Sequence, residues 1–206
     1  PASPVIVGTV DTPGIAQGVT VSGNYAYVAD GTLGLQVIDI SNPAAPAIVG
    51  SIGTPGFAAG VTVSGNYAFV AADTSGLQVI DISNPAAPAI VGSIDTPGAA
   101  YSVIVSGNYA YVADYSFGLQ IIDISNPAAP AIVGSVDTPA FAYGVTVSGN
   151  YAYVADANSG LQVIDISNRA ATDIIDSTDT TRFASGVTVS GNYAYVPDIN
   201  NVLQFI

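Results

Sequence analysis

Apolar residues recur along this chain in short runs separated by turn residues. In the first part of the chain these runs are Val5–Val10, Gly18–Ser22, Tyr25–Ala29 and Leu35–Ile40. Turn signals such as Gly-Asn and Ser-Asn-Pro lie between them, as is typical of short strands joined by tight connections. The runs are nearly continuous in apolar residues rather than alternating, so we expect strands covered on both faces.

This four-strand pattern repeats with a spacing of 42 residues, the interval between Pro4 and Pro46. The repeats span residues 4–45, 46–87, 88–129, 130–171 and 172–206. Copies of one four-stranded unit at this period are typical of propeller blades. The sequence therefore predicts one all-β domain, a five-bladed β-propeller. A parallel β-helix is the main structural rival, but its coils are shorter than this unit.

The two ends of the sequence predict how the ring closes. Residues 1–4 match the linker at 43–46, so the chain begins just before a fourth-type strand. Ile206 aligns with Ile38, inside a third-type strand. We therefore expect the N-terminal strand to pair with the C-terminal one and complete the last blade, because such closure removes exposed sheet edges.

The segments LQVIDISNPAAPAIVGSI and GVTVSGNYAYVAD, which recur through all five units, resemble the LVIVD repeat family of β-propellers. The resemblance implies the propeller fold and carries almost no information about activity. That family occurs mostly in secreted and surface proteins of bacteria and archaea, which implies an extracellular or cell-surface location. The fifth unit departs most, with TDIIDSTDTTRFAS in place of PAIVGSIDTPGFAA, so we expect the last blade to be the least regular.

Composition excludes several classes of partner. The chain has no Lys, His, Cys or Glu, and its net charge is -13 with Arg169 and Arg182 as its only basic residues. Nucleic acids and anionic membrane surfaces are therefore not expected partners, and no apolar run reaches the roughly 18 residues of a spanning helix. The sequence starts at Pro1 without a signal segment, so we expect a mature or excised region. The Lys-free, acidic composition is compatible with a salty extracellular setting, and a monomer is favoured.

The copies differ most in the turns at one end of the blades, which we call the top face. The bottom face carries the Ser-Gly-Asn hairpins and the Ser-Asn-Pro linkers, which hardly change. We expect a ligand pocket at the top mouth of the central channel. Its candidate residues are Gln17, Tyr101, Tyr143, Ser185, Tyr115, Phe117 and Arg182.

The alternative interpretation of these differences is drift in exposed loops. Aromatic faces with a few hydrogen-bonding groups suit a sugar or a small polar ligand. Phe57, Phe141 and Phe183, also in the top turns, are predicted to pack between blades rather than to contact ligand.

Aspartates recur at fixed places in the repeat. The weak candidates for binding Ca²⁺ or Mg²⁺ follow the second strand, at Asp30, Asp114, Asp156 and Asp198. Oxygen ligands suit both ions, but the chain has no Asp-x-Asp-x-Asp-Gly loop. Asp beside Gly, Ser or Thr commonly accepts backbone hydrogen bonds and shapes turns. We therefore favour the turn role and expect no cofactor.

Few residue types remain for catalysis. Without His or Cys there is no Ser-His-Asp or Cys-His centre and no ordinary zinc site. Paired aspartates could cleave glycosides on a five-bladed propeller, but short turns leave such acids exposed to water and hard to tune. We therefore expect a non-catalytic binding or interaction module with a carbohydrate or protein partner. A structural spacer, a cation-dependent glycan binder and an Asp-pair glycosidase stay as alternatives.

Overall fold

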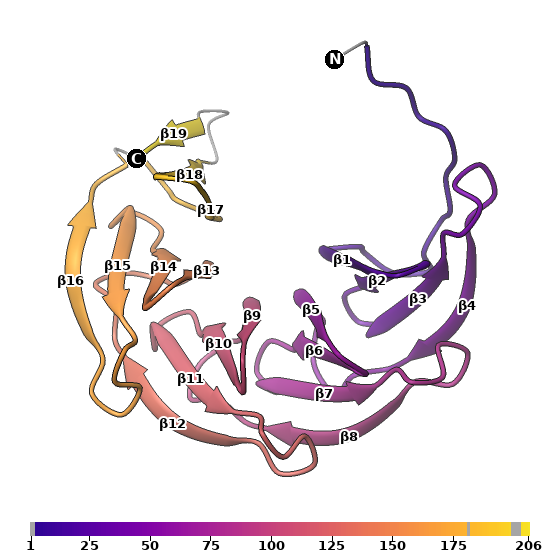
Figure 1. The fold of residues 1–206 in the computed structure, drawn as a ribbon, viewed down its shortest axis with the longest axis horizontal. Helices are drawn as coiled ribbons and strands as arrows, with labels where there is room; N and C mark the ends of the chain where they lie inside the picture. The colour runs from indigo at the N-terminus through magenta and orange to yellow at the C-terminus, as the bar shows by residue number, and fades with distance from the viewer. Residues whose placement is uncertain (1–2, 181, 199–202) are drawn as a thin grey trace.

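The computed structural model of the chain describes residues 3–180, 182–198 and 203–206. These residues form antiparallel sheets that stand side by side around a common axis, as the blades of a propeller do (Figure 1). The predicted all-β, five-bladed propeller is confirmed. No helix in the described ranges is long and apolar enough to cross a membrane.

Each blade is a meander whose strands run from the axis outwards. The innermost strands are β1 (Gly18–Ser22), β5 (Gly60–Ser64), β9 (Ser102–Ser106), β13 (Gly144–Ser148) and β17 (Thr188–Ser190). The second strands are β2 (Tyr25–Ala29), β6 (Tyr67–Ala71), β10 (Tyr109–Ala113), β14 (Tyr151–Ala155) and β18 (Tyr193–Pro197). The third strands are β3 (Leu35–Asp39), β7 (Leu77–Asp81), β11 (Leu119–Asp123), β15 (Leu161–Asp165) and β19 (Leu203–Phe205). The outermost strands are β4 (Ala47–Ile52), β8 (Ala89–Ile94), β12 (Ala131–Val136) and β16 (Asp173–Thr178).

We number the blades along the chain, from blade 1 (β1–β4) to blade 5 (β17–β19). In blades 1 to 4 the pairing of the third and fourth strands shifts register at the same place, between Val37 and Ile38 in blade 1. One residue of the outer strand is left over at this β-bulge, and a bulge bends the strand that carries it. The outer strands accordingly curve around the periphery in Figure 1.

Apolar side chains pack between consecutive blades. Between blades 1 and 2, Leu35 and Val37 pack on one side and Val70 and Ile80 on the other, all buried. The same arrangement recurs at the next two junctions. The prediction that these strands are covered on both faces is therefore confirmed for the interior of the array. Tyr27, Phe69 and Tyr111, which occupy one position of the repeat in blades 1 to 3, are also buried.

The outer strands β4, β8 and β12 also pack against the linker of the following blade. A Cβ atom at Gly50 would lie 2.1 Å from the carbonyl oxygen of Pro85, so only glycine fits there. Gly8 lies against Pro43 in the same way, also at 2.1 Å. Residues around Gly8 therefore pack on blade 1 as the outer strand β4 packs on blade 2, although they form no strand themselves.

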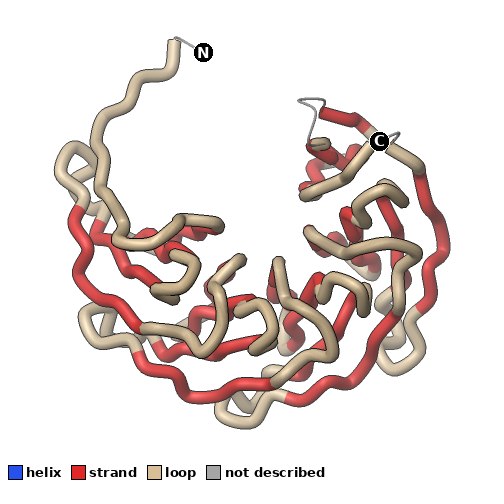
Figure 2. The backbone as a smooth tube through the Cα atoms, turned by 180° about the vertical axis from the view of Figure 1, so that it is seen from behind, coloured by secondary structure: helices blue, strands red, loops and turns tan. Residues whose placement is uncertain are grey.

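The structure corrects the prediction that the N-terminal segment closes the ring. Within the described ranges β19 pairs with β18 alone, and residues 3–17 contain no strand. Val5 and Ile6 are 78% and 86% exposed. Figures 1 and 2 show the N-terminal segment and blade 5 on opposite sides of a gap.

A difference in the fifth unit gives a physical reason for the missing pair. In blade 1 the fourth strand passes so close to Gly34 that a Cβ atom there would lie 2.3 Å from the carbonyl oxygen of Ile52. The equivalent position in the fifth unit is Val202, which lies outside the described residues. Blade 1 therefore requires glycine at this position, and the sequence of the fifth unit lacks it.

Blade 5 is the least regular blade, as its sequence predicts. Its innermost strand has three residues, whereas β1, β5, β9 and β13 have five. Pro197 takes the place of Ala29 and has no amide hydrogen to offer the inner strand. The hydrogen bond from the Ser185 amide to the Pro197 carbonyl is 3.2 Å long, against 2.9 Å for the matching bond from Tyr101 to Ala113.

Candidate ligand site at the channel mouth

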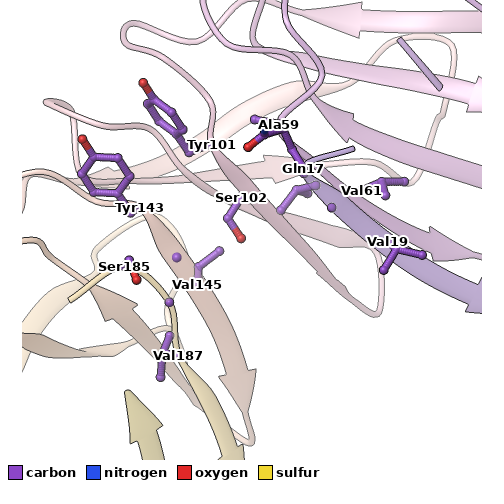
Figure 3. Close-up of a pocket in the computed structure, with 15 residues that line it drawn as sticks. Gln17, Val19, Ala59, Val61, Tyr101, Ser102, Tyr143, Val145, Ser185 and Val187 are labelled. Atoms are coloured by element: carbon purple, nitrogen blue, oxygen red, sulfur yellow. The ribbon is translucent and has the colours of Figure 1, made fainter. Parts of the chain in front are cut away.

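The starts of the five innermost strands surround one cavity of about 380 Å³ on the axis of the fold. Each blade contributes three consecutive residues to its wall. The first residue of each triplet is Gln17, Ala59, Tyr101, Tyr143 or Ser185. The structure thus brings together Gln17, Tyr101, Tyr143 and Ser185, the four candidates predicted to ring the mouth (Figure 3). The cavity does not require the missing strand pair, because all five inner strands line it without that pair.

Aromatic rings from blades 3, 4 and 5 form one contiguous group beside this cavity. Tyr101 and Tyr143 have ring centroids 5.0 Å apart, and Tyr115 lies 5.6 Å from each. Phe141 stacks on Tyr115 at 4.3 Å with an interplanar angle of 7°, and Phe183 lies 4.9 Å from Tyr143. We call these five residues the aromatic cluster. The contacts of Phe141 and Phe183 join neighbouring blades, which confirms their predicted packing role.

Tyr115 has an unusual backbone conformation at the centre of the aromatic cluster. Its φ is 50°, and the matching residue of blade 1 is Gly31 with φ 62°. The equivalent residues Asp73 and Ala157 also have positive φ, of 49° and 47°, so this conformation belongs to the repeated turn, and it costs more free energy for a bulky residue than for glycine. Two backbone hydrogen bonds with Ala142 hold Tyr115 there, at 3.2 and 2.9 Å. The sequence thus places a tyrosine where the backbone favours glycine, and its ring joins blade 3 to blade 4.

Phe117 and Arg182 lie apart from this arrangement. Phe117 is 42% exposed and lines no part of the cavity wall. Arg182 is exposed and is not a lining residue either. Ser102 does line the cavity, and sequence reasoning missed it. The signal was present, because the other four inner strands have glycine at that position.

The hydroxyl groups of the cavity tyrosines are held in their neutral form. Burial raises the pKa of both Tyr101 and Tyr143. The negative charge of Asp73 adds to the rise in the pKa of Tyr101, and Tyr115 adds to the rise for both. Near neutral pH these phenols can therefore donate a hydrogen bond, and their rings keep the negative faces of an uncharged aromatic.

The candidate metal-binding aspartates Asp30, Asp114 and Asp156 accept hydrogen bonds from residues of the top turns. Asp114 accepts a 2.6 Å hydrogen bond from the Thr96 hydroxyl and a 2.9 Å bond from the Gly98 amide. Asp30 and Asp156 accept the matching pairs in blades 1 and 4, which confirms the turn role for these three residues. Burial raises the pKa of Asp114 and Asp156, against the lowering effect of these hydrogen bonds. Asp198 is also buried, at 6% exposure. Among the described residues no group of three or more acidic, His or Cys side chains could hold a metal ion.

Comparison with known protein families identifies the repeat. The LVIVD repeat matches residues 13–54, 55–96, 97–138, 141–180 and 181–206. The chain belongs to the LVIVD repeat family. Each of the first four LVIVD repeats begins in or just after the top turn that precedes an innermost strand, so that one repeat corresponds to one blade. The units predicted at 4–45 and onwards instead take their first strand from the preceding blade.

Solved structures show the same architecture in unrelated sequences. The crystal structure of the computationally designed Ika8 protein aligns with 91% of this chain, with a TM-score of 0.73 and 11% identity. The chain spans 56% of the length of Ika8. The designed Ika4 protein aligns with 77% of this chain over 96% of its own length, with a TM-score of 0.64 and 11% identity. At this identity the likeness shows the fold alone. No curated protein matches the chain.

Proposed function

We propose that this LVIVD propeller is a non-catalytic binding module whose ligand occupies the top mouth of the central channel. The observation that carries the proposal is the convergence of variable residues on one cavity. Side chains that differ between blades, namely Gln17, Tyr101, Tyr143 and Ser185, line the same space. If these positions served only the fold, every blade would place the same demand on them and the same residue would be expected in each. The differences between blades therefore favour a role in binding a ligand.

The chemistry of the mouth favours recognition over reaction. Asp114 and Asp156 already accept hydrogen bonds within their own turns, so they are poorly placed to exchange protons with a substrate. The half-buried aspartates that end the third strands have lowered pKa values, because their own Ser neighbours donate to them, as Ser41 does to Asp39. A general acid near neutral pH needs a raised pKa and access to substrate together.

A partner of moderate size fits the cavity. A volume of about 380 Å³ is near the lower end for small-molecule sites. It suits a monosaccharide, another small polar molecule or one protruding side chain of a protein partner. In keeping with the acidic, Lys-free composition, we place the module in an extracellular or cell-surface setting.

A ligand screen with matched variants tests the proposal. The purified chain is screened on a glycan array and a small-molecule library, and hits are titrated by calorimetry. Tyr101→Ala with Tyr143→Ala should weaken a true hit at least tenfold. Tyr151→Ala is the control, because Tyr151 is exposed at the bottom end of blade 4 and away from the cavity. Equal binding by the parent and the double variant would refute a site at the mouth.

A further inference from the structure

The aromatic cluster lies in a protein with a strong excess of negative charge, and the two features together define a ligand class. We propose that the mouth is selective for organic ammonium cations, that is, a positively charged nitrogen carrying alkyl groups. This inference rests on the proposed binding function and names the chemistry of its ligand.

The geometry of the rings provides the first part of the argument. Tyr101 and Tyr143 both line the cavity, on the side where blades 3 and 4 meet. The π faces of aromatic rings are negative, and a cation within about 6 Å of a ring centroid is attracted to them. Because the two centroids are 5.0 Å apart with the planes tilted by 47°, one alkylammonium group resting on this pair can contact both rings.

Tyr115 and Phe183 contact rings of that pair, Phe141 stacks on Tyr115, and none of the three lines the cavity. The ring centroid of each lies within 5.6 Å of another ring centroid of the aromatic cluster. Packing against these rings therefore restricts the side chains of Tyr101 and Tyr143. A site whose side chains are already ordered loses less entropy when the ligand binds. The cluster therefore offers a preformed aromatic surface to an alkylated nitrogen.

Charge provides the second part. Asp73 lies in the top turn next to the inner strand of blade 3, where backbone hydrogen bonds of 3.1 and 3.0 Å join it to Ala100. After burial, its negative charge is the next contribution to the raised pKa of the Tyr101 hydroxyl. A carboxylate beside an aromatic surface attracts a cation and leaves a neutral ligand unaffected.

Neither of the two basic side chains of the protein lines the cavity. The guanidinium of Arg169 lies 4.3 Å from the centroid of the Tyr109 ring, and its Nε donates to the Tyr111 hydroxyl at 3.1 Å. Tyr109 begins β10 at the bottom end of blade 3, opposite the mouth. Arg182 is in a top turn but lines no part of the cavity. Lining groups such as Gln17 and Ser102 are neutral, so the cavity offers an anion no charged partner.

The experiment compares a cation with a neutral molecule of the same shape. Choline and 3,3-dimethylbutan-1-ol are titrated into the full chain at low salt, together with neutral monosaccharides, and chemical shifts and heats are recorded. Choline should bind at least tenfold more tightly than the neutral alcohol, and salt should weaken choline alone. Tyr101→Leu and Tyr143→Leu should each weaken choline at least fivefold, whereas Tyr101→Phe keeps the ring and should keep the affinity.

Asp73→Asn tests the role of the carboxylate. It should weaken choline at least threefold and leave the neutral alcohol unchanged. Asp173→Asn removes the same charge from an exposed position at the start of β16, at the bottom edge of blade 4, and should have no such effect. Melting temperatures of all variants, measured in parallel, separate lost binding from lost folding.

Each result has one consequence. If choline and the neutral alcohol bind equally, or if Asp73→Asn and Asp173→Asn act alike, the cation preference is refuted. If a monosaccharide binds at the mouth and choline does not, the preference is refuted while the binding function stands. If no compound binds, or if the tyrosine variants bind as the parent does, both proposals fail.

Discussion

Blade 3 and the two end blades are built from the same repeat but have different surroundings. Val103 in the inner strand of blade 3 is 6% exposed, whereas Val19 at the same position of blade 1 is 65% exposed. Leu119 in blade 3 is fully buried, and the matching Leu203 in blade 5 is 50% exposed. The repeat itself therefore does not determine burial, because each blade is covered by its neighbours, and the stability of such arrays depends on the junctions between repeats.

The largest effect is expected when this pair of leucines is truncated. Leu119→Ala leaves a cavity between blades 3 and 4 and should lower the free energy of unfolding by about 2–5 kcal/mol. Leu203→Ala removes a half-exposed side chain and should cost less than about 1 kcal/mol. Urea denaturation of both variants makes the comparison. Equal losses would mean that blade 5 is covered in solution, by closure of the ring or by another molecule.

Substitutions in the top turns of blades 1 and 3 should change the free energy of unfolding by a smaller amount. Tyr115→Ala removes the stacked ring and keeps a Cβ atom at positive φ, whereas Tyr115→Gly removes both. The glycine variant should be more stable than the alanine variant by about 1 kcal/mol. In blade 1, Gly31→Ala should cost at least as much, because it introduces the same backbone strain and its Cβ atom would lie 3.0 Å from the Phe57 ring. If the alanine variant of Tyr115 is the more stable, the backbone at this position is not strained.

The pH dependence of stability should distinguish buried top turns from exposed bottom turns. Burial raises the pKa of Asp114 above the ordinary value of 3.8, so the folded state takes up this proton more readily than the unfolded state. The contribution of Asp114 to stability therefore rises as the pH falls from above the raised pKa to about 3.8. Asp114→Asn should remove this rise from unfolding curves measured between pH 7 and pH 4.

Asp123→Asn is the matched variant in a bottom turn. Hydrogen bonds from Ser125 lower the pKa of Asp123, so its contribution is present above pH 3.8 and is lost as the pH falls through the lowered pKa. Its removal should therefore lower stability by a constant amount above about pH 3.8, and the loss of stability that the parent shows below that pH should disappear. A change in the same pH window for both variants would show that the top-turn carboxylate is as well solvated as the bottom one.

The smallest effect is expected in the N-terminal segment. Ile6→Lys alters a side chain that is 86% exposed and should change the free energy of unfolding by less than about 0.5 kcal/mol. A charge on an unpaired apolar segment should also reduce self-association, which light scattering can follow. A loss of 2 kcal/mol or more would indicate that this segment is paired and buried in solution.

Much of this architecture could be predicted from sequence, because the repeat encodes local structure. The Gly-Asn hairpins, the continuous apolar strands and the period of 42 residues each act within one blade or between adjacent blades, and the structure has them where predicted. Closure of the ring could not be predicted in the same way. It depends on the angle between blades summed around the ring, and on single positions such as Val202 where the fifth unit departs from glycine.

Only part of the candidate site could be predicted from the sequence. Alignment of the repeats placed Gln17, Tyr101, Tyr143 and Ser185 at one mouth, because equivalent residues of a propeller lie on one circle around the axis. It could not place Phe117 or Arg182, which lie outside the strands and line no part of the cavity. The contacts within the aromatic cluster depend on rotamers and inter-blade distances that the repeat does not encode.

Cross-linking between paired positions tests most directly whether the end blades lack a neighbour. The chain has no cysteine, so introduced pairs report without background. Ile38 and Ile48 are partners in blade 1, and Ile206 and Ile6 would be the matching pair in a closed ring. Disulfides form readily only when the Cα atoms lie within about 7 Å. We predict that Ile38→Cys with Ile48→Cys gives an intramolecular disulfide and that Ile6→Cys with Ile206→Cys does not. Equally rapid disulfide formation by both pairs in the monomer would contradict the open arrangement.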